Sequence, residues 1–172
     1  PRVHKTEKED RIMIHKNISI KAEGSLKDSH LTTYILDSYE ELEPNLKRPL
    51  VLICPGGAYR FTADREAEMI ALHLNSAGYH AAVLRYSCAP AIFPTALLEV
   101  AESIKLLKEK AEEWHIDTEK VFVMGFSAGG HLAASYGVFW NRPFVAEKTG
   151  VKTEELKVSG LILCYPVITS KE

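Results

Sequence analysis

Hydrophobic residues along the chain follow two spacings, which together predict short strands separated by helices. Four short runs are apolar almost throughout, as in parallel strands buried on both faces: residues 50–54, 79–86, 121–124 and 161–165. Residues 94–114 instead repeat apolar side chains about every 3.6 positions, and residues 62–78 form a second amphipathic helix that Gly78 closes. This alternation predicts an α/β fold with a mostly parallel sheet and helices on both faces.

The N-terminal part of the chain has a different pattern, which predicts an antiparallel hairpin. Isoleucine recurs at positions 12, 14, 18 and 20, and residues 31–36 form a second stretch rich in strand-forming residues. We expect this hairpin to lie at an edge of the sheet. Residues 141–157 are polar and contain Pro143 and Gly150, so we predict a loop or small excursion there within a single domain.

The third apolar run leads directly into the motif Gly-Phe-Ser-Ala-Gly at residues 125–129, which an apolar helix follows. A Gly-x-Ser-x-Gly sequence between a strand and a helix is the layout of a nucleophile elbow, a sharp turn that exposes the serine hydroxyl. Gly125 and Gly129 fit this turn, because a Cβ atom at either position would collide with the adjoining backbone. The motif therefore predicts that Ser127 is a nucleophile and that the Ala128 N–H is a donor to an oxyanion.

The first apolar run ends in a second turn motif, Pro-Gly-Gly-Ala-Tyr at residues 55–59. Taken alone, this motif also fits an ordinary turn at the end of a strand. Acyl transfer, however, requires N–H donors aimed at the oxyanion of the tetrahedral intermediate, and a Gly-Gly turn lets the backbone approach closely enough to supply one. Because the elbow follows roughly 70 residues later, we interpret the turn as the source of a second donor.

With these motifs the chain resembles the α/β-hydrolase superfamily, most closely its esterase and lipase branch, which includes acetyl-xylan-esterase-like carbohydrate esterases. The resemblance covers residues 50–169 and is carried by five segments: residues 55–59, 84–86, 93–96, 125–132 and 164–167. It implies that Ser127 is the nucleophile, and that the N–H groups of Ala128 and of either Gly57 or Ala58 form the oxyanion hole. The chain has Cys-Pro where many relatives have His-Gly before the glycine pair, which leaves the choice between Gly57 and Ala58 open.

The resemblance also implies a catalytic triad in the chain order serine, acid, histidine. His131 is the single histidine after Ser127, and it lies one helical turn beyond the serine, away from the strand tips where substrate binds. We predict a packing or hydrogen-bonding role for His131, and we expect the triad acid and histidine beyond Glu172. Residues 1–172 would then be a single α/β-hydrolase domain that is incomplete at its C-terminus, because the apolar strand at residues 161–165 needs later elements to cover it.

Several other residues near the expected site carry predictions. Tyr59 follows the Gly-Gly turn and Tyr165 follows a strand tip at the same edge of the sheet as Ser127, so both are candidates for lining the substrate pocket. Glu66 belongs to a charged segment that we predict to be a solvated helix start. Glu99 and Glu102 lie in the long helix, where relatives often carry an acid, and this position suggests a structural hydrogen bond.

The composition excludes several other classes of protein: 46% of the 172 residues are hydrophobic, 26% are charged, and the formal net charge is -2. This balance gives no electrostatic footprint for nucleic acid. Since neither a long apolar span nor a signal peptide is visible, we expect no membrane partner and a cytoplasmic protein, free to form a homo-oligomer, that acts on a small-molecule ester. We expect the three cysteines to be buried reduced thiols, with no metal site and no cofactor.

These expectations combine into one predicted function, a serine carboxylic-ester hydrolase that acts through an acyl-enzyme. The resemblance implies short-chain esters, above all acetyl esters of a sugar or small alcohol. Two alternatives stay open at this point. One is a serine peptidase of the prolyl-oligopeptidase type, which uses the same elbow but normally carries a repeat array that is not seen here. The other is a non-catalytic α/β-hydrolase that keeps the pocket for binding.

Overall fold

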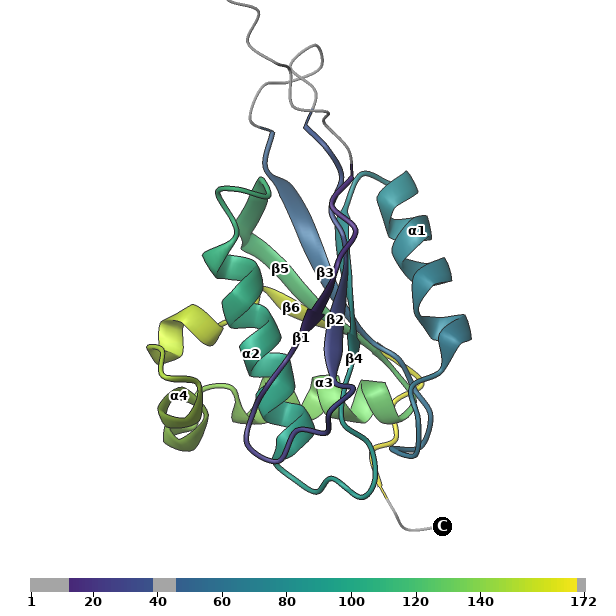
Figure 1. Ribbon diagram of the computed structural model, residues 1–172, viewed down its shortest axis with the longest axis vertical. Helices are drawn as coiled ribbons and strands as arrows, with labels where there is room; N and C mark the ends of the chain where they lie inside the picture. Colours follow the sequence, from purple (N-terminus) through teal and green to yellow (C-terminus); the bar gives the residue numbers. More distant parts are fainter. Residues whose placement is uncertain (1–12, 39–45, 170–172) are drawn as a thin grey trace, which may run out of the picture.

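The structure is a computed structural model that describes residues 13–38 and 46–169, in which strands and helices alternate along the chain (Figure 1). The strands are β1 (Asn17–Ser19), β2 (His30–Tyr34), β3 (Arg48–Cys54), β4 (His80–Arg85), β5 (Ile116–Phe126) and β6 (Gly160–Cys164). The α-helices are α1 (Glu68–Ser76), α2 (Thr95–Glu109), α3 (Ala128–Phe139) and α4 (Pro143–Thr149), and the 3-10 helices are η1 (Asp64–Glu66) and η2 (Thr153–Leu156).

The strands form a sheet in the order β1-β2-β4-β3-β5-β6. Strands β4, β3, β5 and β6 run parallel to one another, whereas β2 pairs antiparallel with both β1 and β4. The mostly parallel sheet and the antiparallel hairpin at its edge are therefore confirmed. Ile14 and Ile35 extend the hairpin by one bridge, and Ile12 lies outside the described residues.

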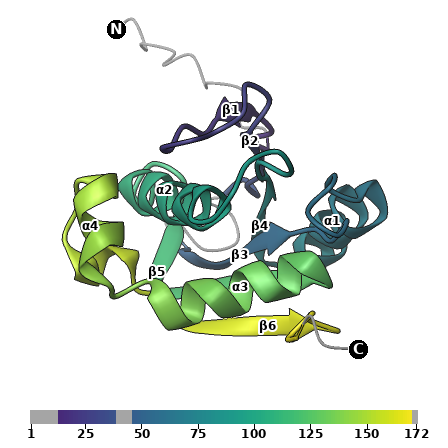
Figure 2. The same cartoon turned by 90° about the horizontal axis from the view of Figure 1, so that it is seen from below.

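Helices cover both faces of the sheet, as Figure 2 shows in a view from below. Leu50 and Leu52 of β3 belong to the core under α2, α3 and α4, and the alternate residues Val51 and Ile53 belong to the smaller core under α1. The parallel strands all end at the lower edge of the sheet in Figure 1. Because ligands of open α/β sheets bind at the carboxyl ends of the strands, this edge is where the functional loops should meet.

Residues 141–157, which we predicted to be a loop or small excursion, contain the helix α4 and the 3-10 helix η2. Pro143 opens α4, and Gly150, with φ 70°, ends it in the left-handed conformation. Val145 and Leu156 are fully buried, so the segment is fixed by packing against the core. A helix of seven residues is too short to show an apolar period in the sequence, and tertiary contacts supply most of its stability.

The long helix that we predicted over residues 94–114 ends earlier, at Glu109. Ala111 and Trp114 are nevertheless buried, because the chain turns back onto the core before β5 begins. The Ile116 N–H donates to the Ala111 carbonyl oxygen at 2.8 Å and closes this turn. The apolar spacing therefore continues past the end of the helix.

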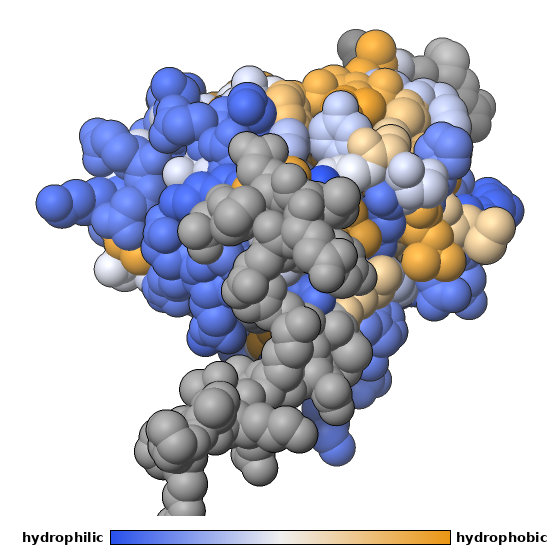
Figure 3. Space-filling model, turned by 90° about the horizontal axis from the view of Figure 1, so that it is seen from above, coloured by the Kyte–Doolittle hydropathy of each residue, from blue (hydrophilic) through white to orange (hydrophobic). Residues whose placement is uncertain are grey.

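The last described strand, β6, lies at the second edge of the sheet and is far more exposed than the centre. Ile162 and Leu163 are 37% and 42% exposed, whereas Leu52 and Ile53 of β3 are completely buried. Hydrophobic residues gather on this side of the molecule (Figure 3). Within the described ranges, no helix is both long and apolar enough to cross a membrane.

Candidate active site

Ser127 occupies a sharp turn between the end of β5 and the start of α3, as the motif predicted. Its backbone angles are φ 51° and ψ -115°, a strained conformation for a residue with a side chain. A Cβ atom at Gly125 would lie 2.0 Å from the Gly129 carbonyl oxygen, and one at Gly129 would lie 2.0 Å from the Cys54 carbonyl oxygen. The predicted steric need for both glycines is therefore confirmed.

The backbone of Ser127 is fixed on both sides, while its hydroxyl is left free. The Ser127 N–H donates to the Cys164 carbonyl oxygen at 3.0 Å, and the Ser127 carbonyl oxygen accepts from the N–H groups of His131 at 3.0 Å and Val167 at 3.2 Å. Among the described residues, none forms a hydrogen bond with Ser127 Oγ. The turn thus holds the Ser127 backbone with three hydrogen bonds, and the hydroxyl has no hydrogen-bond partner in the part of the chain that the structure describes.

The turn that follows β3 has an unusual backbone over three successive residues. Gly57, Ala58 and Tyr59 have φ values of 134°, 54° and 56°, and only glycine adopts such angles without strain. This turn packs against the elbow, since a Cβ atom at Gly56 would lie 3.1 Å from the Ser127 Cβ atom. Strain of this kind is common at functional sites, where the surrounding structure holds it in place.

Two of the predicted donors meet at one cavity of about 590 Å³, here called the donor cavity, which is lined by Ala58, Tyr59, Ala128, His131 and residues 167–169. Ala128 is the first residue of α3, and the first N–H groups of a helix have no partner within it. The turn after β3 and the elbow therefore border the same space. Two segments that are to share an oxyanion must border one space, so the predicted donors Ala58 and Ala128 stay candidates for an oxyanion hole.

Glu66 is buried, so our prediction of a solvated helix start is wrong for this residue, although the Arg65 side chain beside it is 85% exposed. Glu66 Oε2 accepts from the Gly56 N–H at 2.7 Å, and Glu66 Oε1 accepts from the Tyr165 hydroxyl at 2.9 Å. The helix η1 directs this carboxylate inward, where it is the acceptor for the Gly56 N–H. No periodic signal marks such a short helix in the sequence, which is why Glu66 was missed.

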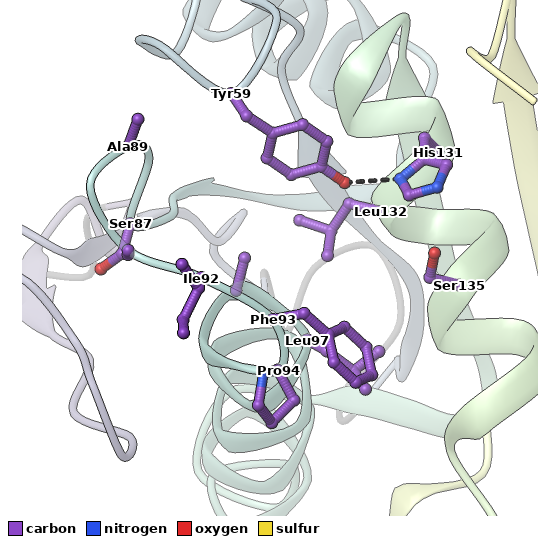
Figure 4. Close-up of a pocket in the computed structure, with 12 residues that line it drawn as sticks. Tyr59, Ser87, Ala89, Ile92, Phe93, Pro94, Leu97, His131, Leu132 and Ser135 are labelled. Carbon is purple, nitrogen blue, oxygen red and sulfur yellow. Dashed lines mark hydrogen bonds between the residues drawn. The ribbon is translucent and has the colours of Figure 1, made fainter. Parts of the chain in front are cut away.

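Tyr59 and His131 form a hydrogen-bonded pair beside the donor cavity (Figure 4). The distance from the Tyr59 hydroxyl to His131 Nδ1 is 2.8 Å. Burial raises the pKa of Tyr59, so the phenol keeps its proton and is able to donate it to His131 Nδ1. The predicted hydrogen-bonding role of His131 is confirmed by this contact.

The two remaining tyrosines near the site have different surroundings. The buried Tyr86 hydroxyl donates to the Pro55 carbonyl oxygen at 2.7 Å and supports the start of the strained turn, a role that the sequence analysis missed. Tyr165 is 64% exposed and packs on Phe126 with ring centroids 5.9 Å apart. Because its hydroxyl is bonded to Glu66, a place for Tyr165 in the substrate pocket stays a prediction.

Cys54 stands directly before the strained turn, and it is completely buried. Burial raises the pKa of the Cys54 thiol to about 12, so the group is a neutral thiol near pH 7 and a poor nucleophile. Cys54, Cys88 and Cys164 are all free, with Cys164 partly exposed. In the part of the chain that the structure describes, no three histidine, cysteine or acidic side chains are grouped as a metal site would require.

Glu99 makes the structural hydrogen bonds that we predicted, and it is completely buried. Glu99 Oε2 accepts from the Ser87 N–H at 2.7 Å, while Glu99 Oε1 accepts from the Ser87 hydroxyl at 2.5 Å and the Ser25 hydroxyl at 2.7 Å. The carboxylate therefore joins α2 to the loop after β4 and to the N-terminal segment.

Known proteins resemble this chain in both sequence and structure. Endo-1,4-beta-xylanase B of Butyrivibrio fibrisolvens is 30% identical over 135 residues, which are 73% of this chain and 20% of the xylanase. An acetylxylan esterase of Xylanibacter ruminicola is 28% identical over 119 residues, which are 69% of this chain and 22% of the esterase. The chain thus spans about a fifth of the length of these curated relatives.

Solved structures match a larger share of their own length. The carboxylesterase Cest-2923 from Lactobacillus plantarum superposes with a TM-score of 0.77 and 28% identity, over 91% of this chain and 57% of that one. The sequence profile of the BD-FAE family matches residues 36–169, which is well over half of the chain. The protein therefore belongs to the BD-FAE family and has the α/β-hydrolase fold.

Proposed function

We propose that the complete protein is a serine carboxylic-ester hydrolase in which Ser127 is the nucleophile. The observation that carries this proposal is the strained elbow, which holds an unpaired serine hydroxyl beside the turn after β3. A hydroxyl in this setting can attack a carbonyl carbon, and backbone N–H groups at the donor cavity can stabilise the charge that develops.

The reaction follows the usual course of acyl transfer. Ser127 Oγ attacks the ester carbonyl carbon, and its proton passes to a histidine that we place outside the described residues. The carbonyl oxygen becomes an oxyanion, which accepts hydrogen bonds from the Ala128 N–H and from the Ala58 or Gly57 N–H. The bond to the alcohol then breaks, the histidine returns the proton to the departing oxygen, and water releases the acid from the acyl-enzyme by the same route.

Short-chain esters, above all acetyl groups on a sugar or small alcohol, are the substrates that we propose. One curated relative is named for acetylxylan esterase activity, and the matched solved structure is a carboxylesterase. The peptidase and the non-catalytic binding protein remain the two alternatives, because either could keep the elbow. Activity measurements on the complete protein distinguish all three.

The test compares the wild type with Ser127→Ala and with Ser76→Ala, which removes an exposed serine at the end of α1. We expect a fluorophosphonate probe to label the wild type and Ser76→Ala but not Ser127→Ala. Turnover of acetyl esters should fall by about 10³-fold or more in Ser127→Ala. The fold should survive, since Ser127 Oγ has no hydrogen bond to a described residue.

Each contrary outcome has a distinct meaning. Labelling that persists in Ser127→Ala would rule out Ser127 as the nucleophile. Labelling with cleavage of peptides but not of esters would identify a peptidase, and complete lack of labelling and turnover would identify a binding protein.

A further inference from the structure

A second cavity, of about 250 Å³, lies next to the donor cavity and shares two of its residues, Tyr59 and His131. We call it the apolar cavity, because most of its other lining residues are hydrophobic, among them Ile92, Phe93, Leu97 and Leu132. In Figure 4 the Tyr59–His131 pair stands at one end of this cavity, and the hydrophobic side chains lie beyond it. The pair therefore lies where the two cavities adjoin, and we call it the wall.

The wall is held in place from several directions. The Tyr59 hydroxyl and His131 Nδ1 are 2.8 Å apart, and the two rings meet nearly at right angles with centroids 5.8 Å apart. The Tyr59 ring also packs edge-on against Tyr86, and the Tyr59 carbonyl oxygen accepts from the Ala89 N–H at 2.7 Å. Both the ring and the backbone of Tyr59 are thus anchored, while His131 projects from the rigid helix α3.

The size and chemistry of the apolar cavity indicate what could occupy it. Pockets that hold a whole drug-sized ligand measure roughly 300–1,000 Å³, so about 250 Å³ suits part of a ligand rather than all of it. Hydrophobic walls favour an alkyl group, since burial of each methylene is favourable. A cavity of this kind next to the donor cavity is suited to the chain of an acyl group.

We propose that the Tyr59–His131 pair sets the acyl-chain specificity, by closing the donor cavity against the apolar cavity. This inference rests on the proposed function, because it concerns the acyl group of the same ester. With the wall intact, the acyl group is confined to the donor cavity and short chains are preferred. With the wall opened, straight chains of four to six carbons reach the apolar cavity and become good substrates.

The test is His131→Ala in the complete protein, assayed with p-nitrophenyl acetate, butyrate and hexanoate. His131 is exposed and lies inside α3, where alanine is well tolerated. We expect kcat/KM for butyrate relative to acetate to rise by about 10-fold or more. Val138→Ala, at another exposed position of the same helix, should leave this ratio unchanged.

Two further variants separate the wall from a general loosening of the site. Ala96 of α2 lines the apolar cavity, so Ala96→Phe added to His131→Ala should refill it and restore the preference for acetate. Tyr59→Phe removes the hydrogen bond but keeps both rings, and it should shift the ratio less than His131→Ala does. An unchanged ratio in His131→Ala, or no reversal by Ala96→Phe, would overturn the proposal.

Labelling rates provide a second measurement that does not depend on deacylation. Ethyl and hexyl fluorophosphonates should label the wild type at very different rates, and His131→Ala should selectively accelerate the hexyl probe. Equal acceleration of both probes would contradict the proposal that this pair excludes long chains. A wild type that neither reacts with these probes nor hydrolyses esters would instead refute the proposed function.

Discussion

Glu66 and Glu99 are buried carboxylates in two different regions beside the carboxyl ends of the parallel strands, and they have similar partners. Each accepts one backbone N–H at 2.7 Å, from Gly56 and from Ser87 respectively, together with at least one side-chain hydroxyl. Their positions differ, because Gly56 begins the turn at the proposed oxyanion hole, whereas Ser87 follows β4.

If the proposed function holds, a buried carboxylate that accepts a backbone N–H supports catalysis when that N–H belongs to the turn at the oxyanion hole, and supports folding alone when it lies elsewhere. A buried carboxylate is satisfied when N–H and O–H donors surround it. The loss of Glu99 should appear in stability alone, while the loss of Glu66 should also appear in turnover. Four measurements test or refine this contrast.

The largest effect is expected for Glu99→Gln, which places an amide group against the Ser87 N–H and hydroxyl. Hydrogen bonds to a buried charge are strong, and the amide nitrogen cannot accept from the Ser87 N–H or from the serine hydroxyls. We therefore expect the free energy of unfolding to fall by roughly 3–5 kcal/mol. Urea unfolding of the complete protein measures this loss, and kcat of the folded fraction should not change. A fall in kcat comparable to that of Glu66→Gln would show that Glu99 affects turnover as much as Glu66 does.

The buried histidine His80 makes the stability of the fold depend on pH. Burial lowers the pKa of His80 to about 4, although its hydrogen bond to the His115 carbonyl oxygen opposes the shift. The unfolded chain takes up this proton near pH 6.5 and the folded chain only near pH 4, so protonation favours unfolding. We expect a stability loss of roughly 3 kcal/mol between pH 6.5 and pH 4 from this group.

The matched variant for this measurement is His80→Asn, whose side-chain oxygen can still accept from the Leu36 N–H. Unfolding free energies measured from pH 4 to pH 8 should fall less steeply below pH 6.5 in the variant than in the wild type. Parallel curves for the two proteins would show that His80 does not titrate as described.

Glu66→Gln should affect catalysis more than folding. The change weakens the bond that holds the Gly56 N–H, and Gly56 precedes the candidate donors Gly57 and Ala58. A small displacement of an oxyanion donor costs transition-state stabilisation, so we expect kcat to fall by about 10-fold with KM little changed. The free energy of unfolding should fall by only about 1–2 kcal/mol. An unchanged kcat would show that Glu66 does not help to position the oxyanion donors.

The smallest effects are expected when one hydroxyl donor is removed from each carboxylate. Tyr165→Phe deletes the bond to Glu66, and Ser25→Ala deletes the bond to Glu99. Tyr165 is mostly exposed, so its loss should cost less than about 1 kcal/mol, and Ser25→Ala should cost about 1 kcal/mol. Thermal unfolding of both variants, with kcat measured beside it, shows which hydroxyl matters to which property.

Much of the fold was predictable because its signals are local. The buried parallel strands appear as continuous apolar runs, and the edge hairpin as alternation, since each pattern reflects one local environment. The elbow was predictable because its motif is local in the sequence. Gly125 is required by its contact with the Gly129 backbone, and Gly129 by its contact with the Cys54 backbone at the end of β3.

The features that were missed depend on contacts between distant segments. Glu66 and Tyr165 are 99 residues apart, and neither residue type nor spacing indicates that they meet. The short helix α4 is held by Val145, which is buried in the core, and its seven residues are too few to show an apolar period. The choice between Gly57 and Ala58 likewise depends on where the substrate oxygen lies, which the sequence does not encode locally.

The hydrogen bond from the Ser127 N–H to the Cys164 carbonyl oxygen also has a consequence for the order of events during synthesis. Chains emerge from the ribosome at roughly 5–20 residues per second, so β6 follows the serine by roughly 2–8 s. During that interval the elbow lacks the acceptor for its amide and the neighbour that covers one side of β5. The Ser127 amide is therefore made early but gains its acceptor only when β6 has docked, so the contacts of the elbow are completed late in the assembly of the sheet.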